Sequence, residues 1–332
     1  MTTEEVRMKT ITFAEALGEA ILEEMERDET IFTYGEDIAK QGGIFGAYSS
    51  LLGKYPDRIF DTPISEEVIY GSALGAALVG MRPVVEFHFS DFLFTGIQSI
   101  TLQIEKIRYM TGGQGKLHLV LRGPDGVSNS AAAQHSESIE TIFMHIPGIK
   151  IIIPSTPYDV KGLMKTALRG DDPVICFEHK SLYYLKGEIP EEEYLIPFGK
   201  ADIKREGKDI TVVTMSRMVH ESLKAAQELE KEGISLEIID LRTLVPWDKD
   251  LVIKSVQKTN HLIVAHETWK RAGWGAEVSS TIQEEAFDFL DAPIMRIGAR
   301  NVPMPFSAVL QNFVTPDKES IIDAARQMME GN

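Results

Sequence analysis

Two adjacent carboxylates, Glu66 and Glu67, stand at the start of the segment ISEEVIYGSALGAALVG, residues 64–80. The serine before them, Ser65, has a side chain suited to capping a helix that begins here. Carboxylates in the first turn of a helix are also stabilised by the helix dipole. The spacing alone therefore allows either glutamate to be explained as a stabiliser of the helix start, without any chemical role.

Three glycines in the same segment, Gly71, Gly75 and Gly80, need a different explanation. Glycine lowers helix propensity, so a helix that contains several glycines is expected where another backbone comes very close. We expect a tightly packed helix pair, either within the chain or across a subunit boundary. A glutamate at such a contact is poorly solvated and holds its proton more firmly, which is the condition for proton transfer near neutral pH.

Two further segments place histidine beside other polar residues. In VVEFHFSDFLF (84–94), the phenylalanines follow the strand period toward a core, whereas His88 and Asp91 point elsewhere and could line a cleft. In RGPDGVSNSAAAQHSESIE (122–140), His135 lies near the end of a polar loop. Histidine titrates near physiological pH, and loops held by a rigid sheet often carry catalytic groups. Each histidine also fits an ordinary strand or surface position.

A third segment, VAHETWKRAGWGAE (264–277), ends a strand with His266 and Glu267, and its glycines are suited to starting a helix. We expect a structural or partner-binding role there. Three other histidines lack the spacing of metal ligands: His145, His179 and His261. The sequence also lacks a glycine-rich phosphate loop, a Gly-x-Ser-x-Gly elbow and a paired-histidine metal motif. A chain of this design is missing the half that would hold a phosphorylated cofactor.

The elements that must position these groups alternate between short apolar strands and amphipathic helices. Strands are predicted over residues 31–34, 84–89, 116–123, 149–153 and 174–177. Continuous apolar runs are typical of strands covered on both faces, so we expect a largely parallel sheet with helices on both sides. A charged stretch interrupts the pattern, which then resumes. The sequence thus predicts two α/β domains, 1–185 and 210–332, joined by a linker over 186–209.

The composition restricts the partners and the compartment. The 332 residues carry a formal net charge of −16, which disfavours binding to nucleic acid or to anionic membranes. No apolar run approaches the roughly 20 residues of a membrane span, and the N-terminus lacks the apolar core of a secretion signal. The single cysteine, Cys176, cannot form an internal disulfide and is expected to be a small buried residue. We expect a cytoplasmic protein.

Long motifs follow one another along the chain: YGEDI, GGIFG, FDTPISE, VVEFHFSDF, KIRYMTGG, AAQHSES, PGIKIIIPSTPYDVKGL, DDPVICFEHK and IDLRTLVPWD. In content and order they resemble the beta subunits of 2-oxo acid dehydrogenase complexes, in the thiamine-diphosphate-dependent decarboxylating component. The resemblance runs from about Thr10 to the C-terminus. It implies an α/β fold of two domains, a pyrimidine-binding domain with a parallel sheet and helices on both faces, and a transketolase C-terminal-like domain.

The resemblance also implies roles for individual residues. Glu66, in the element TPISE, matches the glutamate that bonds a ring nitrogen of the cofactor's aminopyrimidine and so activates the cofactor. Phe92 matches the aromatic residue that packs on the pyrimidine, and Ile64 matches an apolar residue beside that glutamate. His135 matches the histidine that assists transfer of the acyl group to lipoamide. His88 occupies a position that faces the substrate pocket.

In this family the thiamine diphosphate is shared with a separate alpha subunit, which holds the diphosphate through magnesium. The Gly-Asp-Gly…Asn motif for this purpose is absent here, since RGDDP (169–173) is too short to supply it. The implied assembly is a heterotetramer with the alpha subunit and a second beta subunit, docked through the C-terminal domain on a lipoyl acyltransferase core. A structural potassium ion near Leu119 and Asp172 is a further implication.

The motifs leave the substrate open. GGIFG and KIRYMTGG resemble acetoin-type members, LRTLVPWD and EVSSTIQEEAF resemble branched-chain types, and pyruvate-type subunits share most of both. A non-catalytic scaffold subunit is the alternative of a different class, and the retained Glu66, Phe92 and His135 disfavour it. A stand-alone transketolase-like enzyme or a sulfur-sugar synthase relative is disfavoured by the missing diphosphate motif and the short chain.

Overall fold

The computed structural model describes residues 7–128 and 130–330, which form two compact units. The first unit comprises the chain up to Asp125 together with Ile142–Phe198. The second comprises Gly126–Thr141 and the chain from Gly199 onward. The loop 126–141 thus belongs by its contacts to the second unit, although it lies within the sequence range expected for the N-terminal domain. In the described part of the chain, no helix combines the length and apolar character needed to cross a bilayer.

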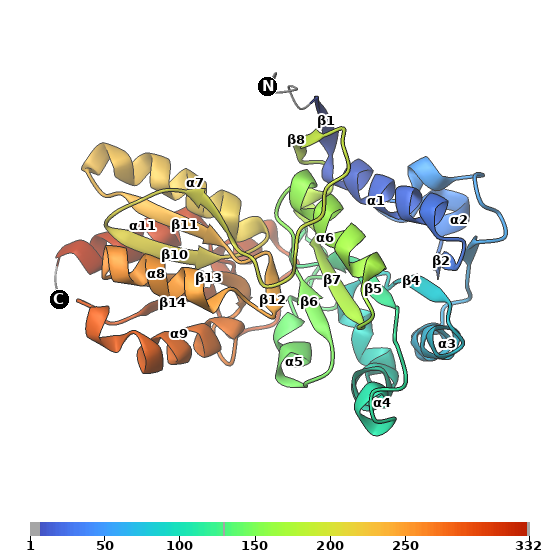
Figure 1. Ribbon diagram of the computed structural model, residues 1–332. Coiled ribbons are helices and arrows are strands. Elements are labelled where there is room, and N and C mark those ends of the chain that lie inside the picture. Colours follow the sequence, from blue (N-terminus) through green and yellow to red (C-terminus); the bar gives the residue numbers. More distant parts are fainter. Residues whose placement is uncertain (1–6, 129, 331–332) are drawn as a thin grey trace, which may run out of the picture. The chain divides into compact units, whose positions relative to one another are not determined.

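A parallel sheet forms the centre of the first unit (Figure 1). Its strands follow the order β6-β7-β5-β4-β2-β3, and each pairing in this run is parallel. Their bounds are β2 Ile31–Gly35, β3 Ile59–Asp61, β4 Arg82–Glu86, β5 Val120–Asp125, β6 Lys150–Ile152 and β7 Val174–His179. All residues of β5 and β7 are buried, and in β7 the first four, Val174–Phe177, form the continuous apolar run typical of a strand covered on both faces.

Helices cover both faces of this sheet (Figure 1). α1 (Phe13–Arg27) and α6 (Pro157–Arg169) pack together on one face, and α3 (Glu66–Leu78) lies on the other. The Tyr34 hydroxyl of β2 fixes α3 by donating to the Ile69 carbonyl at 3.0 Å. The shorter helices of this part of the chain are α2 Ile38–Gln41, α4 Glu105–Met110 and α5 Glu140–His145.

The segment expected to be a linker, 186–209, contains two strands. β8 (Lys186–Pro190) pairs antiparallel with β1 (Met8–Thr12) in the first unit. β9 (Asp202–Arg205) pairs antiparallel with β11 in the second unit. Charged strands at sheet edges carry little apolar signal, which is why the sequence pattern does not reveal them.

A charged cluster lies inside the first unit. Arg122 on β5 donates to Glu178 on β7 (Nε to Oε1, 2.7 Å) and to Glu86 on β4. The Tyr183 hydroxyl donates to Glu178 Oε2 at 2.6 Å, and all four side chains are buried. Burial raises the pKa of the Glu86 carboxyl to about 7, against the opposing effect of Arg122. The cluster joins three neighbouring strands through charges removed from water.

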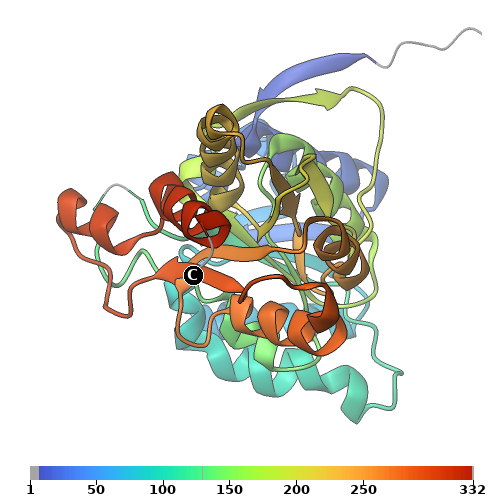
Figure 2. The same cartoon turned by 90° about the vertical axis from the view of Figure 1, so that its left-hand side faces the viewer.

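The second unit has a sheet in the order β14-β13-β10-β11-β9, parallel except for β9. Figure 2 shows helices on both sides of this sheet. α7 and α11 bury apolar side chains on one face, and α8 lies on the other, where Thr211 Oγ1 is 2.6 Å from Ser255 Oγ. The remaining strands of the sheet are β10 Ile210–Thr214, β11 Leu236–Asp240, β13 Leu262–Trp269 and β14 Met295–Ala299, while β12 (Thr243–Val245) lies outside it. The helices are α7 Arg217–Leu229, α8 Lys249–Thr259, α9 Trp274–Glu285, α10 Ala308–Val314 and α11 Lys318–Glu330.

Candidate functional site

Glu66 and Glu67 occupy the first turn of α3, as predicted, but the expected capping by Ser65 is wrong. The Ser65 side chain makes no capping hydrogen bond, and its backbone is extended, with φ −165° and ψ 79°. The bond that orders this turn is tertiary, because Ser99 Oγ donates to Glu67 Oε1 at 2.7 Å. This contact ties α3 to the π-helical segment Ser99–Ile104 and gives Glu67 a structural role.

Glu66 is half-buried at the end of the sheet where β2 finishes. Glu36 directly follows β2, and its pKa is raised by burial and then by the negative charges of Glu66 and Asp37. Tyr70, one turn after Glu66, is fully buried. Burial raises the pKa of the Tyr70 hydroxyl well above its usual value, and Glu66 and Glu36 add to the effect. Two carboxylates and a phenol thus meet at the carboxyl end of a parallel strand, the usual place for a site in such sheets.

The backbone beneath Glu66 is approached closely by Gly96, the last residue of the 3-10 helical segment Ser90–Gly96. A Cβ atom at residue 96 would lie 2.3 Å from Tyr70 Cδ2 and 3.2 Å from the Glu66 carbonyl carbon. Only glycine permits this approach. Within the described part of the chain, the Tyr70 hydroxyl has no hydrogen-bond partner. A buried polar group left in this way is typical of a site that another molecule completes.

The close helix pair expected from Gly71, Gly75 and Gly80 is not made by the described residues. A Cβ at residue 71 would meet only Ser99 Oγ, at 3.5 Å, and one at residue 75 or 80 would meet no described atom within 4 Å. Val79, at the end of the same helix, is 80% exposed. Of the two expected arrangements, close packing of these glycines against another helix of the described chain is therefore wrong. Packing of this helix face across a subunit boundary stays a prediction.

Phe92 and Ile64 adjoin Glu66 on contacting elements. Phe92 lies in the same short helical segment as Gly96, which packs against α3, and Ile64 precedes Glu66 by two residues and is 78% exposed. The Phe89 ring stands edge-on to Phe92, with ring centres 6.0 Å apart, and edge-on to His88, with centres 5.3 Å apart. The element that carries Phe92 therefore contacts the helix that carries Glu66, and Phe89 contacts both Phe92 and His88.

His135 lies in the second unit, on residues 126–141, which we name the His135 loop. Two non-glycine residues of this loop, Ser130 and Ala132, have positive φ angles of 59° and 63°. Left-handed backbone costs an L-residue roughly 1–2 kcal/mol, so it persists where surrounding contacts fix the chain. His135 is half-buried, and its N–H donates to the Ala132 carbonyl at 3.4 Å.

Two family descriptions match the chain: "Transketolase, pyrimidine binding domain" over residues 9–186 and "Transketolase, C-terminal domain" over residues 199–321. The acetoin:2,6-dichlorophenolindophenol oxidoreductase subunit beta of Cupriavidus necator is 44% identical, over 95% of this chain and 96% of the relative. The 2-oxoisovalerate dehydrogenase subunit beta and the pyruvate dehydrogenase E1 component subunit beta of Bacillus subtilis are 41% and 42% identical, over 97% of this chain and 100% of each relative. The chain belongs to the beta-subunit family of 2-oxo acid dehydrogenase complexes.

A solved structure confirms the fold expected for a beta subunit of this family. The chain described as "Split gene transketolase, inactive beta4 tetramer" superimposes with a TM-score of 0.80, over 96% of this chain and 98% of that one, at 22% identity. The three relatives above are named for three different reactions at nearly equal identity. The family is therefore shown, and the identities do not distinguish the substrate of this beta subunit.

The potassium ion expected near Leu119 and Asp172 stays a prediction. Leu119 is buried, and its carbonyl accepts the Val174 N–H at 3.0 Å. Asp172 pairs with Lys150 at 2.9 Å and with Arg108, so its carboxylate already has two cationic partners. Among the residues that the structure describes, no three His, Cys, Asp or Glu side chains are grouped as metal ligands.

Cys176 is a buried residue of β7, as the sequence predicts. Burial, followed by the charge of Glu178, raises the pKa of its thiol well above the usual value. A thiol in this state is a poor nucleophile, so we give Cys176 a packing role.

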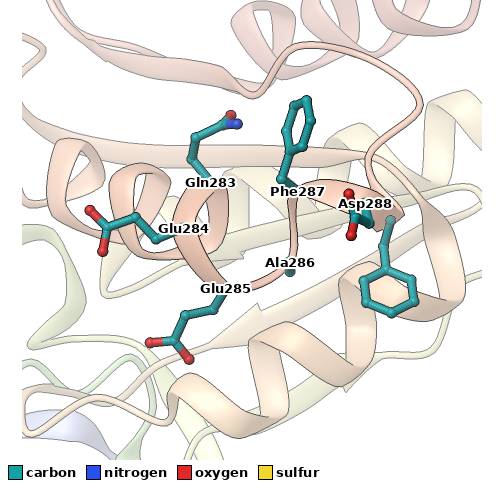
Figure 3. A pocket seen from close by; sticks show the side chains of 7 residues that line it. Gln283, Glu284, Glu285, Ala286, Phe287 and Asp288 are labelled. Carbon is teal, nitrogen blue, oxygen red and sulfur yellow. The ribbon is translucent and has the colours of Figure 1, made fainter.

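A hollow of about 400 Å³ lies at the end of α9 in the second unit. Figure 3 shows the side chains of Gln283 and Phe287 on one side of the chain and Glu285 on the other. Glu285 accepts a hydrogen bond from Lys249 Nζ at 2.7 Å. The lining residues are all consecutive, Gln283–Phe289, and include none of the predicted site residues, so we assign the hollow no role in catalysis.

The sequence reasoning missed Glu36, Tyr70 and Gly96. Glu36 carries a usable signal, since an acidic residue directly after a buried strand is well placed for a site in a parallel sheet. Tyr70 follows Glu66 by one helical turn, but its burial is a tertiary property. Gly96 has no local signal, because its need for glycine arises from the contact with α3.

Proposed function

We propose that this chain is the beta subunit of a thiamine-diphosphate-dependent 2-oxo acid dehydrogenase. With an alpha subunit, it decarboxylates pyruvate or a branched-chain 2-oxo acid and passes the acyl group to lipoamide. The observation that carries the proposal is the placing of Glu66 in the first turn of α3, next to Glu36 and the buried Tyr70. Full-length similarity to beta subunits with these named activities supports it.

The residues around Glu66 fit the aminopyrimidine part of thiamine diphosphate. A carboxylate can bond a ring nitrogen of this group and hold or release a proton there. Phe92 offers an aromatic face, Ile64 an exposed apolar side chain, and Tyr70 a buried hydroxyl without a described partner. When bound, thiamine diphosphate supplies the electron sink for decarboxylation. Glu66 then controls the proton at the ring nitrogen, and Phe92 and Ile64 hold the ring in place.

We assign the diphosphate and its magnesium ion to the alpha subunit, because the Gly-Asp-Gly…Asn motif is absent from this chain. The surface of the first unit supports an extensive interface. Large apolar side chains are exposed on and just after α3, on the segment Ser99–Ile104 that packs against it, and on α4, which follows that segment: Val68, Leu78, Val79, Leu102, Tyr109 and Met110. Apolar surface of this extent marks an interaction site. We propose a heterotetramer with a second beta subunit, docked on a lipoyl acyltransferase core through the second unit.

Reconstitution tests the proposal. We expect decarboxylation and tight thiamine diphosphate binding only when the chain is purified with its alpha subunit. Calorimetry would measure the binding, and reduction of 2,6-dichlorophenolindophenol in the presence of each 2-oxo acid would measure turnover. Full activity of the chain on its own would contradict the shared site.

Two variants test the assigned residues in the reconstituted enzyme. Glu66→Gln removes the carboxylate that controls the proton, so turnover is lost while the assembly, measured by sedimentation, is retained. His135→Ala is expected to slow acylation of a lipoyl domain more than it slows dye-coupled decarboxylation. Equal losses in the two reactions would show that His135 has no specific part in acyl transfer.

An acetoin-cleaving beta subunit is the second candidate, favoured by the 44% identity to the Cupriavidus necator relative. The reconstituted enzyme would be assayed with acetoin, pyruvate and branched-chain 2-oxo acids by the same dye reduction. A kcat/KM for acetoin about tenfold above that for each 2-oxo acid would establish this candidate. The opposite ratio would exclude it.

A further inference from the structure

The His135 loop is attached to the sheet of the second unit at both of its ends. The N–H of Val127, near its start, donates to Glu267 Oε1 at 2.8 Å. The carbonyl of Ser138, near its end, accepts a hydrogen bond from Thr268 Oγ1 at 2.7 Å. Glu267 and Thr268 are neighbours on β13. Two consecutive residues of one strand therefore hold the two ends of the loop that carries His135.

Glu267 is itself held in place by a cation. Arg217 Nη1 donates to Glu267 Oε2 at 2.8 Å and to the Pro316 carbonyl at 3.2 Å. The Glu267 side chain is only 7% exposed. One carboxylate oxygen thus faces the loop backbone and the other faces the guanidinium. Both hydrogen bonds involve an ionised group, and such bonds are shorter and roughly twice as strong as neutral ones.

Two further contacts hold the loop, one of them at a residue with strained backbone. Gln311 Oε1 accepts the N–H of Ser130, a residue with positive φ, at 3.2 Å. Val127 packs in a small apolar cluster with Met304 and Val314. All of these partners belong to the second unit. Side chains distant in sequence, among them the charged Glu267, therefore hold this loop with its left-handed residues.

We infer that Glu267, oriented by Arg217, is a positioning residue that fixes the His135 loop for acyl transfer to lipoamide. The inference rests on the proposed function, from which it takes the role of His135. Glu267 acts through the loop backbone, since its described contact is with the Val127 N–H. Displacing a reacting group by about 1 Å costs on the order of 10²-fold in rate, so loss of this anchor acts on the step that uses His135.

The test compares Glu267→Gln with the wild type in the enzyme reconstituted with its alpha subunit. Glutamine keeps the size of the side chain but removes the charge that bonds Arg217. We expect acylation of a lipoyl domain to slow by roughly 10-fold to 100-fold, while dye-coupled decarboxylation stays within about twofold. Addition of His135→Ala to Glu267→Gln should then slow acylation no further than His135→Ala alone, because both changes remove the same contribution.

Glu237→Gln is the matched control. Glu237 is a buried glutamate of β11, which lies two strands from β13 in the same sheet; it accepts the Gly207 N–H at 3.3 Å and pairs with Lys258. It resembles Glu267 in burial and partners, but these partners lie outside the His135 loop. We expect it to change the urea midpoint without changing the ratio of the two reaction rates.

Hydrogen exchange of the full chain gives a readout that does not depend on the cofactor. In Glu267→Gln, peptides that cover the His135 loop should exchange faster, and those that cover β10 and β11 should not. Wild-type exchange of the loop, or equal slowing of both reactions, would overturn the inference. If His135→Ala itself leaves the ratio of the two rates unchanged, the role proposed for His135 fails and this inference fails with it. If His135→Ala slows acylation more than decarboxylation but Glu267→Gln does not, the inference about Glu267 is overturned while the role proposed for His135 stands.

Discussion

Replacement of Gly96 with alanine tests whether the close contact beneath Glu66 is needed for function. The added Cβ would lie 2.3 Å from Tyr70 Cδ2 and 2.7 Å from Tyr70 Cε2, whereas ordinary van der Waals contact begins at 3.4 Å. The ring must therefore withdraw by about 1 Å in a closely packed interior. Tyr70 is fully buried on α3, so the first turns of the helix have to move with it.

The displacement reaches Glu66 because its carbonyl carbon lies 3.2 Å from the added atom. Overpacking of this kind costs roughly 1–3 kcal/mol of unfolding free energy. A shift of about 1 Å in a catalytic group costs on the order of 10²-fold in rate. We therefore expect Gly96→Ala to lower kcat for decarboxylation by roughly 10-fold to 100-fold. Urea denaturation of the chain and dye-coupled turnover with the alpha subunit measure the two effects.

Gly75→Ala is the control for the stability measurement. Residue 75 lies on the same helix, but a Cβ there meets no described atom within 4 Å. If Gly96→Ala keeps both the wild-type urea midpoint and the wild-type turnover, the close approach is not required and the reasoning is refuted. If stability falls while turnover is unchanged, Gly96 supports the fold without positioning Glu66.

Three other substitutions have expected outcomes. Gly75→Ala should raise the unfolding free energy of the isolated chain by up to about 1 kcal/mol, because alanine favours a helix more than glycine does. The same change should weaken association with the alpha subunit, measured by sedimentation. Unchanged association would contradict packing of α3 across the subunit boundary. Burial raises the pKa of Glu105 from 4.5 to about 8, so the folded state keeps a proton that the unfolded state releases, and stability falls as the pH rises across this window. Glu105→Gln should flatten that dependence in urea titrations at pH 5 and pH 8, and identical slopes would refute the assignment. Arg122→Met leaves Glu86 and Glu178 buried without their cation and should lower the unfolding free energy by roughly 3–5 kcal/mol at pH 8. A loss below about 1 kcal/mol would show that the charged cluster is not needed for stability.

The sheet of the first unit and helix α3 could be predicted because their signals are local. Burial of β7 on both faces is reflected in the continuous apolar run Val174–Phe177, and α3 begins at Glu66, where the carboxylates of its first turn are expected. The contacts of these elements could not be predicted in the same way. Ser65 has the residue type of a cap, yet the bond that orders the turn comes from Ser99, far along the chain. Hydrogen bonds between distant segments leave no local pattern.

The His135 loop shows the same limit at a larger scale. Its position between β5 and α5 suggests that it belongs with the sheet of the first unit, whereas its anchors are Glu267, Thr268 and Gln311 of the second. Glu267 was expected to have a structural or partner-binding role from its place at the end of a strand. The structure identifies its described partners as Val127 and Arg217, which spacing alone cannot name.

The surroundings of Glu66 support the proposal that its chemistry needs a second chain. Proton transfer near neutral pH requires a carboxylate removed from water, yet within this chain Glu66 is only half-buried. The surface beside it is open in the same way: Ile64 is exposed, and no described atom covers Gly75. A partner that packs against this face would exclude water from Glu66 and bury the small residues of α3 in a single step. Under the proposed function, the glycines and Glu66 serve one requirement, since the face that would admit the partner would also be the wall of the site.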